Sequence, residues 1–182
     1  FLRETRTYEI IEDVKNFRSE IGVLFLNGYN RDVLTKMFDD NRLTYTSLFK
    51  ARPHIFVSKS NPLAKHKVVS LEDLEDFPYL SYDQGIHNSF YYSEEILSQI
   101  PHKKSIVVSD RATLFNLLIG LDGYTIATGI LNSNLNGDNI VSIPLDVDDE
   151  IDIVYLKHEK ATLSKMGEKF LDNLVKEVTF DD

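Results

Sequence analysis

The sequence contains no cysteine among its 182 residues. Disulfide bonds, thiol nucleophiles and cysteine-ligated metal sites are therefore excluded. The lack of cysteine also suits a reducing compartment, because disulfides form mainly in oxidising ones.

Long apolar runs are lacking as well. No segment approaches the roughly 18 consecutive apolar residues that a membrane-spanning helix needs, so no membrane partner is expected. The chain begins Phe1-Leu2-Arg3-Glu4-Thr5, with neither a Met nor the basic and apolar pattern of a signal peptide. This beginning indicates a cut within a longer protein, with further residues before Phe1.

Positive charge is scarce relative to negative charge. The chain has 20 Lys and Arg against 29 Asp and Glu, a net charge of −9. Such a surface repels the phosphate backbone, so any contact with DNA must come from another part of the protein. Hydrophobic residues make up 42% and charged residues 27%, which is ordinary for a soluble chain forming one domain or two small lobes.

Recognisable enzyme motifs are absent. There is no Gly-Xaa-Ser-Xaa-Gly elbow, no P-loop and no Gly-Xaa-Gly-Xaa-Xaa-Gly segment. No two histidines are four residues apart, so no helical metal pair can form, and His66, His87 and His102 are expected at the surface. The sequence therefore predicts no catalytic residues, no metal and no cofactor.

Two residue clusters invite a functional interpretation. The carboxylates within 146–152 resemble a calcium loop, but the loop's glycine and its final bidentate glutamate are missing. A solvated turn between two strands is the better interpretation. Phe90-Tyr91-Tyr92 could stack on a ligand, although aromatic residues at helical spacing more often belong to a core.

Apolar periodicity alternates between strand and helix, which predicts an α/β fold with largely parallel sheets. Helices are expected at 7–18, 31–38, 89–100, 110–120 and 162–178, with a short one opened by the capping box Ser70–Asp73. Strands are expected at 20–26, 78–82, 105–109, 124–130, 139–145 and 151–158, with one or two more within 44–59. Apolar crossings near 58–61 and 143–145 fit two lobes joined by two chain passages.

Some of these elements carry more detailed expectations. The strand at 20–26 is a near-continuous apolar run, which predicts burial on both faces. Thr7 is available as the N-cap of the first helix, and Ser109 or Asp110 as the cap of the helix at 110–120. The last helix is expected to bury one stripe, made of Leu163, Met166, Phe170, Leu174 and Val178.

Polar residues gather where predicted strands end and helices begin. In open parallel α/β sheets, ligands bind beyond the carboxyl ends of the strands. This rule selects as candidate binding residues Thr5, Thr7, Asn27, Tyr29, Ser81, Tyr82, Arg111 and Thr128. Each could instead be a capping or turn residue. Arg111 could hold a carboxylate with two hydrogen bonds, or could form a surface ion pair.

Three motifs resemble LysR-type transcriptional regulators. Ser60–Lys65, Val69–Leu74 and Phe77–Leu80 resemble the passage from hinge to second lobe in that family, with Asn61 in place of a histidine. Glu20–Leu24 resembles the family's Asp-Ile-Gly-Ile strand. Leu117–Ile130 resembles its Val-Xaa-Xaa-Gly-Xaa-Gly-Ile-Ala segment.

The last of these motifs departs from the family pattern in two places. Asp122 interrupts the spacing of the glycines, and Thr128-Gly129 stands where Leu-Pro is common. The order and spacing of the three motifs nevertheless cover nearly the whole chain.

The resemblance implies the effector-binding (substrate-binding) domain of such a regulator. Its fold would be similar to that of a type 2 periplasmic binding protein, with two Rossmann-like lobes joined by two crossover strands and an effector between them. The first lobe would be 1–58 plus 146–182, and the second 59–145. The N-terminal winged helix-turn-helix domain, the linker helix and the first strand and helix of the sensing domain would precede this chain.

The implied function is effector sensing by a cytoplasmic homodimer or homotetramer that contacts DNA only through its missing N-terminal domain. Arg111 and the hydroxyl groups favour a small anion such as an amino acid or carboxylate. A secreted solute-binding protein of a transport system is the main alternative, and would need a signal peptide or a lipid-anchored cysteine. An enzyme built on the same scaffold is a second alternative, but the sequence shows no recognisable pair of nucleophile and base.

Overall fold

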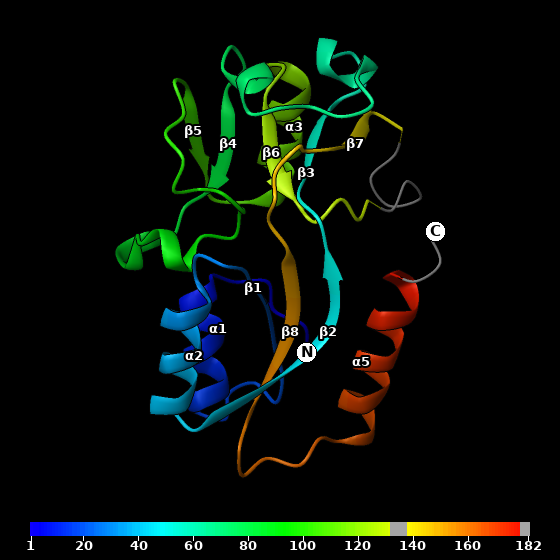
Figure 1. The fold of residues 1–182 in the computed structure, drawn as a ribbon. Helices are drawn as coiled ribbons and strands as arrows, with labels where there is room; N and C mark the ends of the chain where they lie inside the picture. The colour runs from blue at the N-terminus through cyan, green and yellow to red at the C-terminus, as the bar shows by residue number, and fades with distance from the viewer. Residues whose placement is uncertain (132–137, 179–182) are drawn as a thin grey trace. The chain divides into compact units, whose positions relative to one another are not determined.

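The structure, a computed structural model, describes residues 1–131 and 138–178. The chain divides into two compact units, residues 1–50 with 151–182 and residues 51–150. Each unit contains one sheet, a three-stranded sheet in the order β1-β8-β2 and a five-stranded sheet in the order β5-β4-β6-β3-β7 (Figure 1). The first lobe implied by the resemblance reaches residue 58 and so includes β3, which here belongs to the five-stranded sheet.

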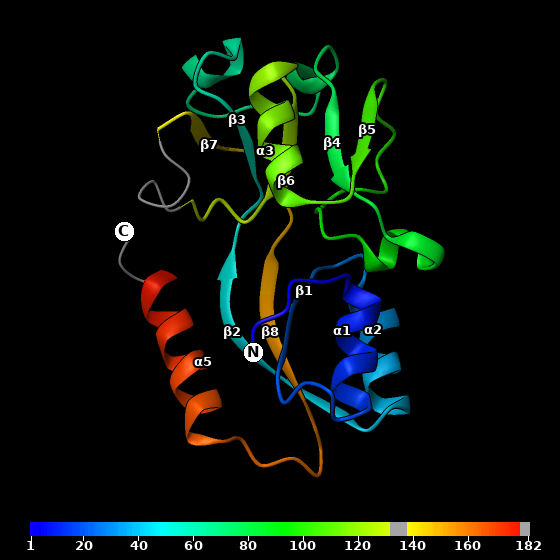
Figure 2. The ribbon, with the colours of Figure 1, turned by 180° about the vertical axis from the view of Figure 1, so that it is seen from behind.

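The first unit uses residues from both ends of the chain. Its elements are α1 (Thr7–Lys15), β1 (Gly22–Leu26), α2 (Arg31–Asp40), β2 (Leu43–Ala51), β8 (Ile151–His158) and α5 (Lys165–Val178). β1 runs antiparallel to β8, and α1 packs on both strands. Within this unit α1 and α2 lie together on one side of the sheet and α5 on the other (Figures 1 and 2).

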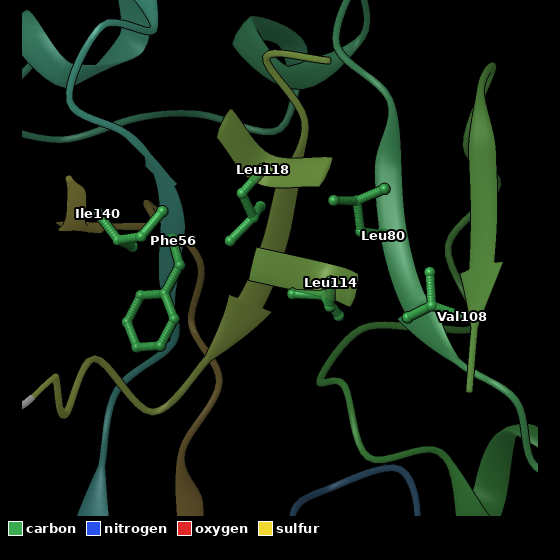
Figure 3. Close-up of a cluster of buried hydrophobic side chains, with 6 residues drawn as sticks. All are labelled: Phe56, Leu80, Val108, Leu114, Leu118 and Ile140. Atoms are coloured by element: carbon green, nitrogen blue, oxygen red, sulfur yellow. The ribbon is translucent and has the colours of Figure 1, made fainter. Parts of the chain in front are cut away.

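The second unit is one continuous stretch of chain. Its strands and helix are β3 (His54–Ser58), β4 (Tyr79–Tyr82), β5 (Ser105–Val108), α3 (Arg111–Gly120), β6 (Tyr124–Ala127) and β7 (Ile140–Pro144). Its short 3-10 helices are η1 (Pro62–Lys65), η2 (Glu72–Leu74), η3 (Gly85–His87) and η4 (Phe90–Tyr92). A hydrophobic core between α3 and the sheet holds the unit together (Figure 3), made of Phe56, Leu80, Val108, Leu114, Leu118 and Ile140.

The α/β class and the succession of strands and helices agree with the sequence prediction, but the predicted largely parallel sheets are wrong. β4 is parallel to β5 and β6, whereas β3 is antiparallel to β6 and β7 and β1 is antiparallel to β8. β3 brings the chain into the second unit and β7 leads toward its exit, so these neighbours run in opposite directions. Apolar periodicity does not encode strand direction, because either direction can be buried.

The strand at 20–26 is shorter and less buried than predicted. It begins at Gly22, and its burial alternates along the strand instead of covering both faces. The strand predicted at 124–130 also ends early, at Ala127. Gly129 follows with φ +84°, and its backbone lies so close to the His54 ring that a Cβ atom would collide with it.

The predicted helix at 89–100 is wrong. Only Phe90–Tyr92 forms a short 3-10 helix, capped by the Ser89 side chain, which accepts a hydrogen bond from the Tyr91 N–H. Leu97 has a φ of 61°, which a helix cannot accommodate. Glu95, Ile96 and Leu97 are all buried, so burial of this irregular segment overrides its helical periodicity.

Capping was predicted correctly at two places and wrongly at a third. Asp110 caps α3 by accepting the Thr113 N–H at 2.8 Å, and Ser70 and Asp73 bond each other's backbone N–H groups ahead of η2. Thr7, however, is the buried first residue of α1, and Arg6 is the N-cap, although its side chain makes no capping hydrogen bond to the helix backbone.

The buried face of α5 also differs from the prediction. Gly167 and Leu171 are buried, whereas Met166 is 75% and Phe170 38% exposed. The Val178 side chain lies outside the described residues. The predicted stripe therefore faces partly away from the unit to which α5 belongs.

Asp152 does not belong to the acidic turn. It is the second residue of β8, is buried, accepts a hydrogen bond from the Ser47 hydroxyl and pairs with Arg31 at 3.1 Å. This carboxylate therefore joins β8 to β2 and α2 inside the first unit.

Candidate ligand-binding site

In the first unit, Thr5 and Thr7 lie at the start of α1. Residues 1–6 form no strand, so the two threonines do not follow one, contrary to the expectation that placed them at a strand end. The Thr5 hydroxyl donates a hydrogen bond to Glu9 in the first turn of α1. Thr7 is buried within the helix.

Asn27 and Tyr29 lie in the turn between β1 and α2, where the predicted strand end was placed. The Asn27 side chain accepts hydrogen bonds from the backbone N–H groups of Tyr29 and Asn30, both at 3.1 Å. The Asn30 side chain, which the sequence did not single out, accepts in return from the Asn27 N–H at 2.9 Å. Two asparagines that bond each other's backbone therefore build this turn.

In the second unit, the parallel pairing of β4 and β5 brings Tyr82 and Arg111 together. Tyr82 is opposite Val108 at the ends of the two strands, and Arg111 opens α3 three residues later. The Arg111 guanidinium carbon lies 5.8 Å from the centroid of the Tyr82 ring. Ser81 is half-buried beside them in β4.

Thr128 lies just beyond the end of β6. Its hydroxyl accepts a hydrogen bond from the Ile130 N–H at 3.4 Å, which makes it part of the turn around Gly129. β4 and β6 are paired only at their first residues, Tyr79 and Tyr124, so the pairing does not bring Thr128 to Tyr82.

Glu95 is the residue at this site that the sequence prediction missed. It is 3% exposed, and its Oε1 accepts the Tyr82 N–H at 2.7 Å. Burial raises the pKa of Glu95 to about 8, with Glu94 adding to the rise and Arg111 opposing it. The wrongly predicted helix at 89–100 hid this position, because a helix gave no reason for one glutamate to turn inward.

Two further polar side chains of the second unit are buried. Gln84, two residues after Tyr82, is 4% exposed, and Tyr79 opens β4 with 3% exposure. Within the described part of the chain, Gln84 Oε1, Glu95 Oε2 and the Tyr79 hydroxyl oxygen are buried without a hydrogen-bond partner. Burial, followed by the charge of Glu95, raises the pKa of Tyr79 well above its ordinary value.

His102 is not the plain surface residue that was expected. Its ring stacks on Tyr79 with centroids 3.8 Å apart, and its Nδ1 is 2.8 Å from the Tyr124 hydroxyl oxygen. Burial lowers the pKa of His102, so the neutral ring is favoured.

Within residues 1–131 and 138–178, no group of three His, Cys, Asp or Glu side chains is placed so that it could hold a metal ion. Within the same residues, no helix is both long and apolar enough to cross a membrane.

Solved structures of LysR-family proteins resemble this chain. HinK, a LysR-family transcriptional regulator from Pseudomonas aeruginosa, matches with a TM-score of 0.64 and 15% identity over 97% of this chain and 59% of its own. The effector-binding domain of QuiR in complex with shikimate matches with a TM-score of 0.63 and 18% identity, over 94% of this chain and 78% of its own. The BenM effector-binding domain with its effector benzoate matches with a TM-score of 0.64 and 19% identity, over 100% of this chain and 80% of its own.

These similarities show that the chain has the type 2 periplasmic-binding-protein-like fold of LysR effector-binding domains. The chain spans only 59% of the length of HinK. No curated protein sequence matches it significantly. The family model described as the LysR substrate binding domain, however, matches residues 2–179. This protein therefore belongs to the family of LysR substrate-binding domains.

Proposed function

We propose that this chain is the effector-sensing domain of a LysR-type transcriptional regulator and that it binds a small anionic metabolite. The family match over residues 2–179 carries the proposal. The matched family consists of the effector-binding domains of transcriptional regulators, and these domains are not enzymes. We therefore propose no catalytic activity for this chain.

The contacts proposed for the metabolite remain the eight residues selected from the sequence. Arg111 is the main candidate for holding a carboxylate, because its planar guanidinium can donate two parallel hydrogen bonds. The Tyr82 ring, 5.8 Å away, can hold that guanidinium in place. QuiR and BenM were solved with shikimate and benzoate, both carboxylates, which supports the same class of effector here.

The properties of the whole protein follow as further proposals. DNA contact would belong to an N-terminal winged helix-turn-helix domain, which fits the net charge of −9 on this chain. The regulator would be a cytoplasmic homodimer or homotetramer. Effector binding would favour one conformation over another and thereby change the affinity for DNA.

A thermal-shift screen of this chain against small carboxylates, amino acids and sugars tests the sensing function. A ligand that binds only the folded state adds about 2.7 kcal/mol to the free energy of unfolding at a hundredfold excess over its Kd. We expect a selective carboxylate to raise the Tm, and Arg111→Ala to abolish the rise. Lys36→Ala, which removes an exposed cation in the first unit, is the matched control.

A screen in which no compound changes the Tm would contradict effector sensing by this chain. An unchanged response of Arg111→Ala would contradict only the role of that residue. Repeating the binding experiment with the full-length protein and its DNA separates a regulator from a solute-binding protein, because only the regulator changes its DNA affinity with the ligand.

A further inference from the structure

Among the residues that the structure describes, β4 has no strand partner along part of one edge. Its pairing with β5 covers all four residues from Tyr79 to Tyr82, but its pairing with β6 covers Tyr79 alone. The N–H groups of Tyr79 and Asp83 bond Lys104 and Val108 on the β5 side. Successive N–H groups of a strand point in opposite directions, so the Tyr82 N–H points toward the open edge.

The carboxylate of Glu95 occupies that open edge. Its Oε1 accepts the Tyr82 N–H at 2.7 Å, as a strand carbonyl would have done. Its Oε2 is buried and has no hydrogen-bond partner among residues 1–131 and 138–178. Burial raises the pKa of Glu95, so its carboxylate form would need a cationic donor at Oε2 to be stable.

Gln84 and Tyr79 carry further buried oxygens in the same unit. Gln84 Oε1 and the Tyr79 hydroxyl oxygen are both buried without a partner in the described part of the chain. Gln84 follows Tyr82 by two residues, and the charge of Glu95 raises the pKa of Tyr79. Glu95 Oε2 can accept a hydrogen bond from an N–H donor of a primary ammonium group.

A positive side chain borders the same place. Arg111 lies over the Tyr82 ring, and its charge lowers the pKa of Glu95 against the effect of burial. A guanidinium beside a carboxyl group can hold a carboxylate and an ammonium that belong to one molecule.

We infer that Glu95 binds the ammonium group of an amino-acid effector whose carboxylate Arg111 holds. This inference rests on the proposed effector-sensing function and names the class of effector. Its structural competitor is a protonated Glu95 that donates its proton to a neighbouring side chain and contacts no ligand.

Matched pairs of ligands separate these two roles. Isothermal titration of the chain with L-glutamate, L-leucine and L-phenylalanine, each beside its 2-hydroxy acid, changes only the ammonium group. A hydrogen-bonded charge contributes enough that we expect at least one amino acid to bind about tenfold or more tightly than its 2-hydroxy acid. Glu95→Gln keeps an acceptor for the Tyr82 N–H and should remove most of this preference.

Glu75→Gln is the matched control, because it removes an exposed carboxylate of the same unit that pairs with Lys103. We expect it to keep the preference for the amino acid. Circular dichroism shows whether Glu95→Gln folds. If it does not, Glu95→Asp serves instead, because its shorter side chain keeps the carboxylate but places it farther from the ligand. This variant should weaken binding of the amino acid alone.

Equal binding of amino acids and 2-hydroxy acids would overturn the inference, as would an unchanged preference in Glu95→Gln. If simple carboxylates bind and no amino acid does, the ammonium site is refuted and effector sensing stands. If nothing in the wider screen binds, both fail.

Discussion

Glu95 is 3% exposed, with one oxygen on the Tyr82 amide and the other without a partner in the described residues. Its pKa of about 8 stands far above the ordinary 4.5, mainly because burial disfavours the charged form. The titratable groups that act on it are Glu94, Arg111 and Tyr79. The protonation state of this one residue therefore couples stability to pH.

The free energy of unfolding should fall as the pH rises from about 4.5 to about 8. Over that range the folded state keeps a proton on Glu95 that the unfolded state has released, and this group contributes a slope of at most about 1.4 kcal/mol per pH unit. Urea unfolding at several pH values measures the slope, which Glu95→Gln should make shallower and Glu75→Gln should leave unchanged. An identical slope in Glu95→Gln would show that Glu95 is ionised in the folded protein.

At the scale of elements, the packing of α3 depends on the apolar residues of its inner face, and the packing of β8 depends on a buried carboxylate. Leu118 is fully buried in the core cluster, and the next residue, Ile119, is 44% exposed. Asp152 ties β8 to β2 and α2 through Ser47 and Arg31. Both cases offer a neighbouring residue as a control.

Leu118→Ala should lower the free energy of unfolding by about 2–5 kcal/mol, because it leaves a cavity between α3 and the sheet. Ile119→Ala, on the outer side of the same helix, should cost less than about 1 kcal/mol. Denaturant unfolding of both variants tests this. Equal losses would mean that α3 does not pack as Figure 3 shows.

Asp152→Asn should lower the free energy of unfolding by about 1–2 kcal/mol, since it weakens the bonds to Ser47 and Arg31, and Arg31 is partly exposed to solvent. Asp148→Asn makes the same change at an exposed position of the acidic turn and should have little effect. Thermal unfolding compares the two, and a tolerated Asp152→Asn would argue against a structural role for this carboxylate.

Two departures from the family pattern meet in the second unit. Asn61, in place of the family's histidine, is 1% exposed, and its Oδ1 accepts the Leu63 N–H at 2.9 Å to cap η1. Its Nδ2 donates to the backbone oxygen of Asp122 at 2.8 Å, and Asp122 has a φ of 51°. The residue that interrupts the glycine spacing therefore forms the turn that Asn61 holds.

At the scale of the whole molecule, the two units differ in how the chain builds them. The second unit is continuous, and all five strands of its sheet lie within 51–150. The sheet of the first unit has β8 between β1 and β2, so its central strand comes from the far end of the chain.

Residues 51–150 produced alone should fold, whereas residues 1–50 alone should not. The continuous fragment keeps its complete sheet and core, but the N-terminal fragment loses the strand that joins β1 to β2. Circular dichroism and cooperative urea unfolding measure this. An unfolded 51–150 fragment would show that its stability depends on the first unit.

Sequence patterns predicted most elements and the polar ends of β4 and α3 because their signals are local. Asp110 caps α3 by bonding Thr113, only three residues further along the chain, and Ser70 bonds Asp73 over the same separation. The prediction of a helix at 89–100 was wrong because apolar periodicity does not reveal that Leu97 adopts a positive φ. The prediction that His102 is a plain surface residue was wrong because its partners, Tyr79 and Tyr124, are distant in sequence.

The sequence by itself determined the family, the α/β class, the caps and an acidic chain without cysteine, since composition and short spacings are properties of neighbouring residues. Only the tertiary structure decided the strand directions, the buried face of α5 and the place of Glu95. Burial depends on segments that meet after folding, and burial is what gives that carboxyl its raised pKa and its position against β4.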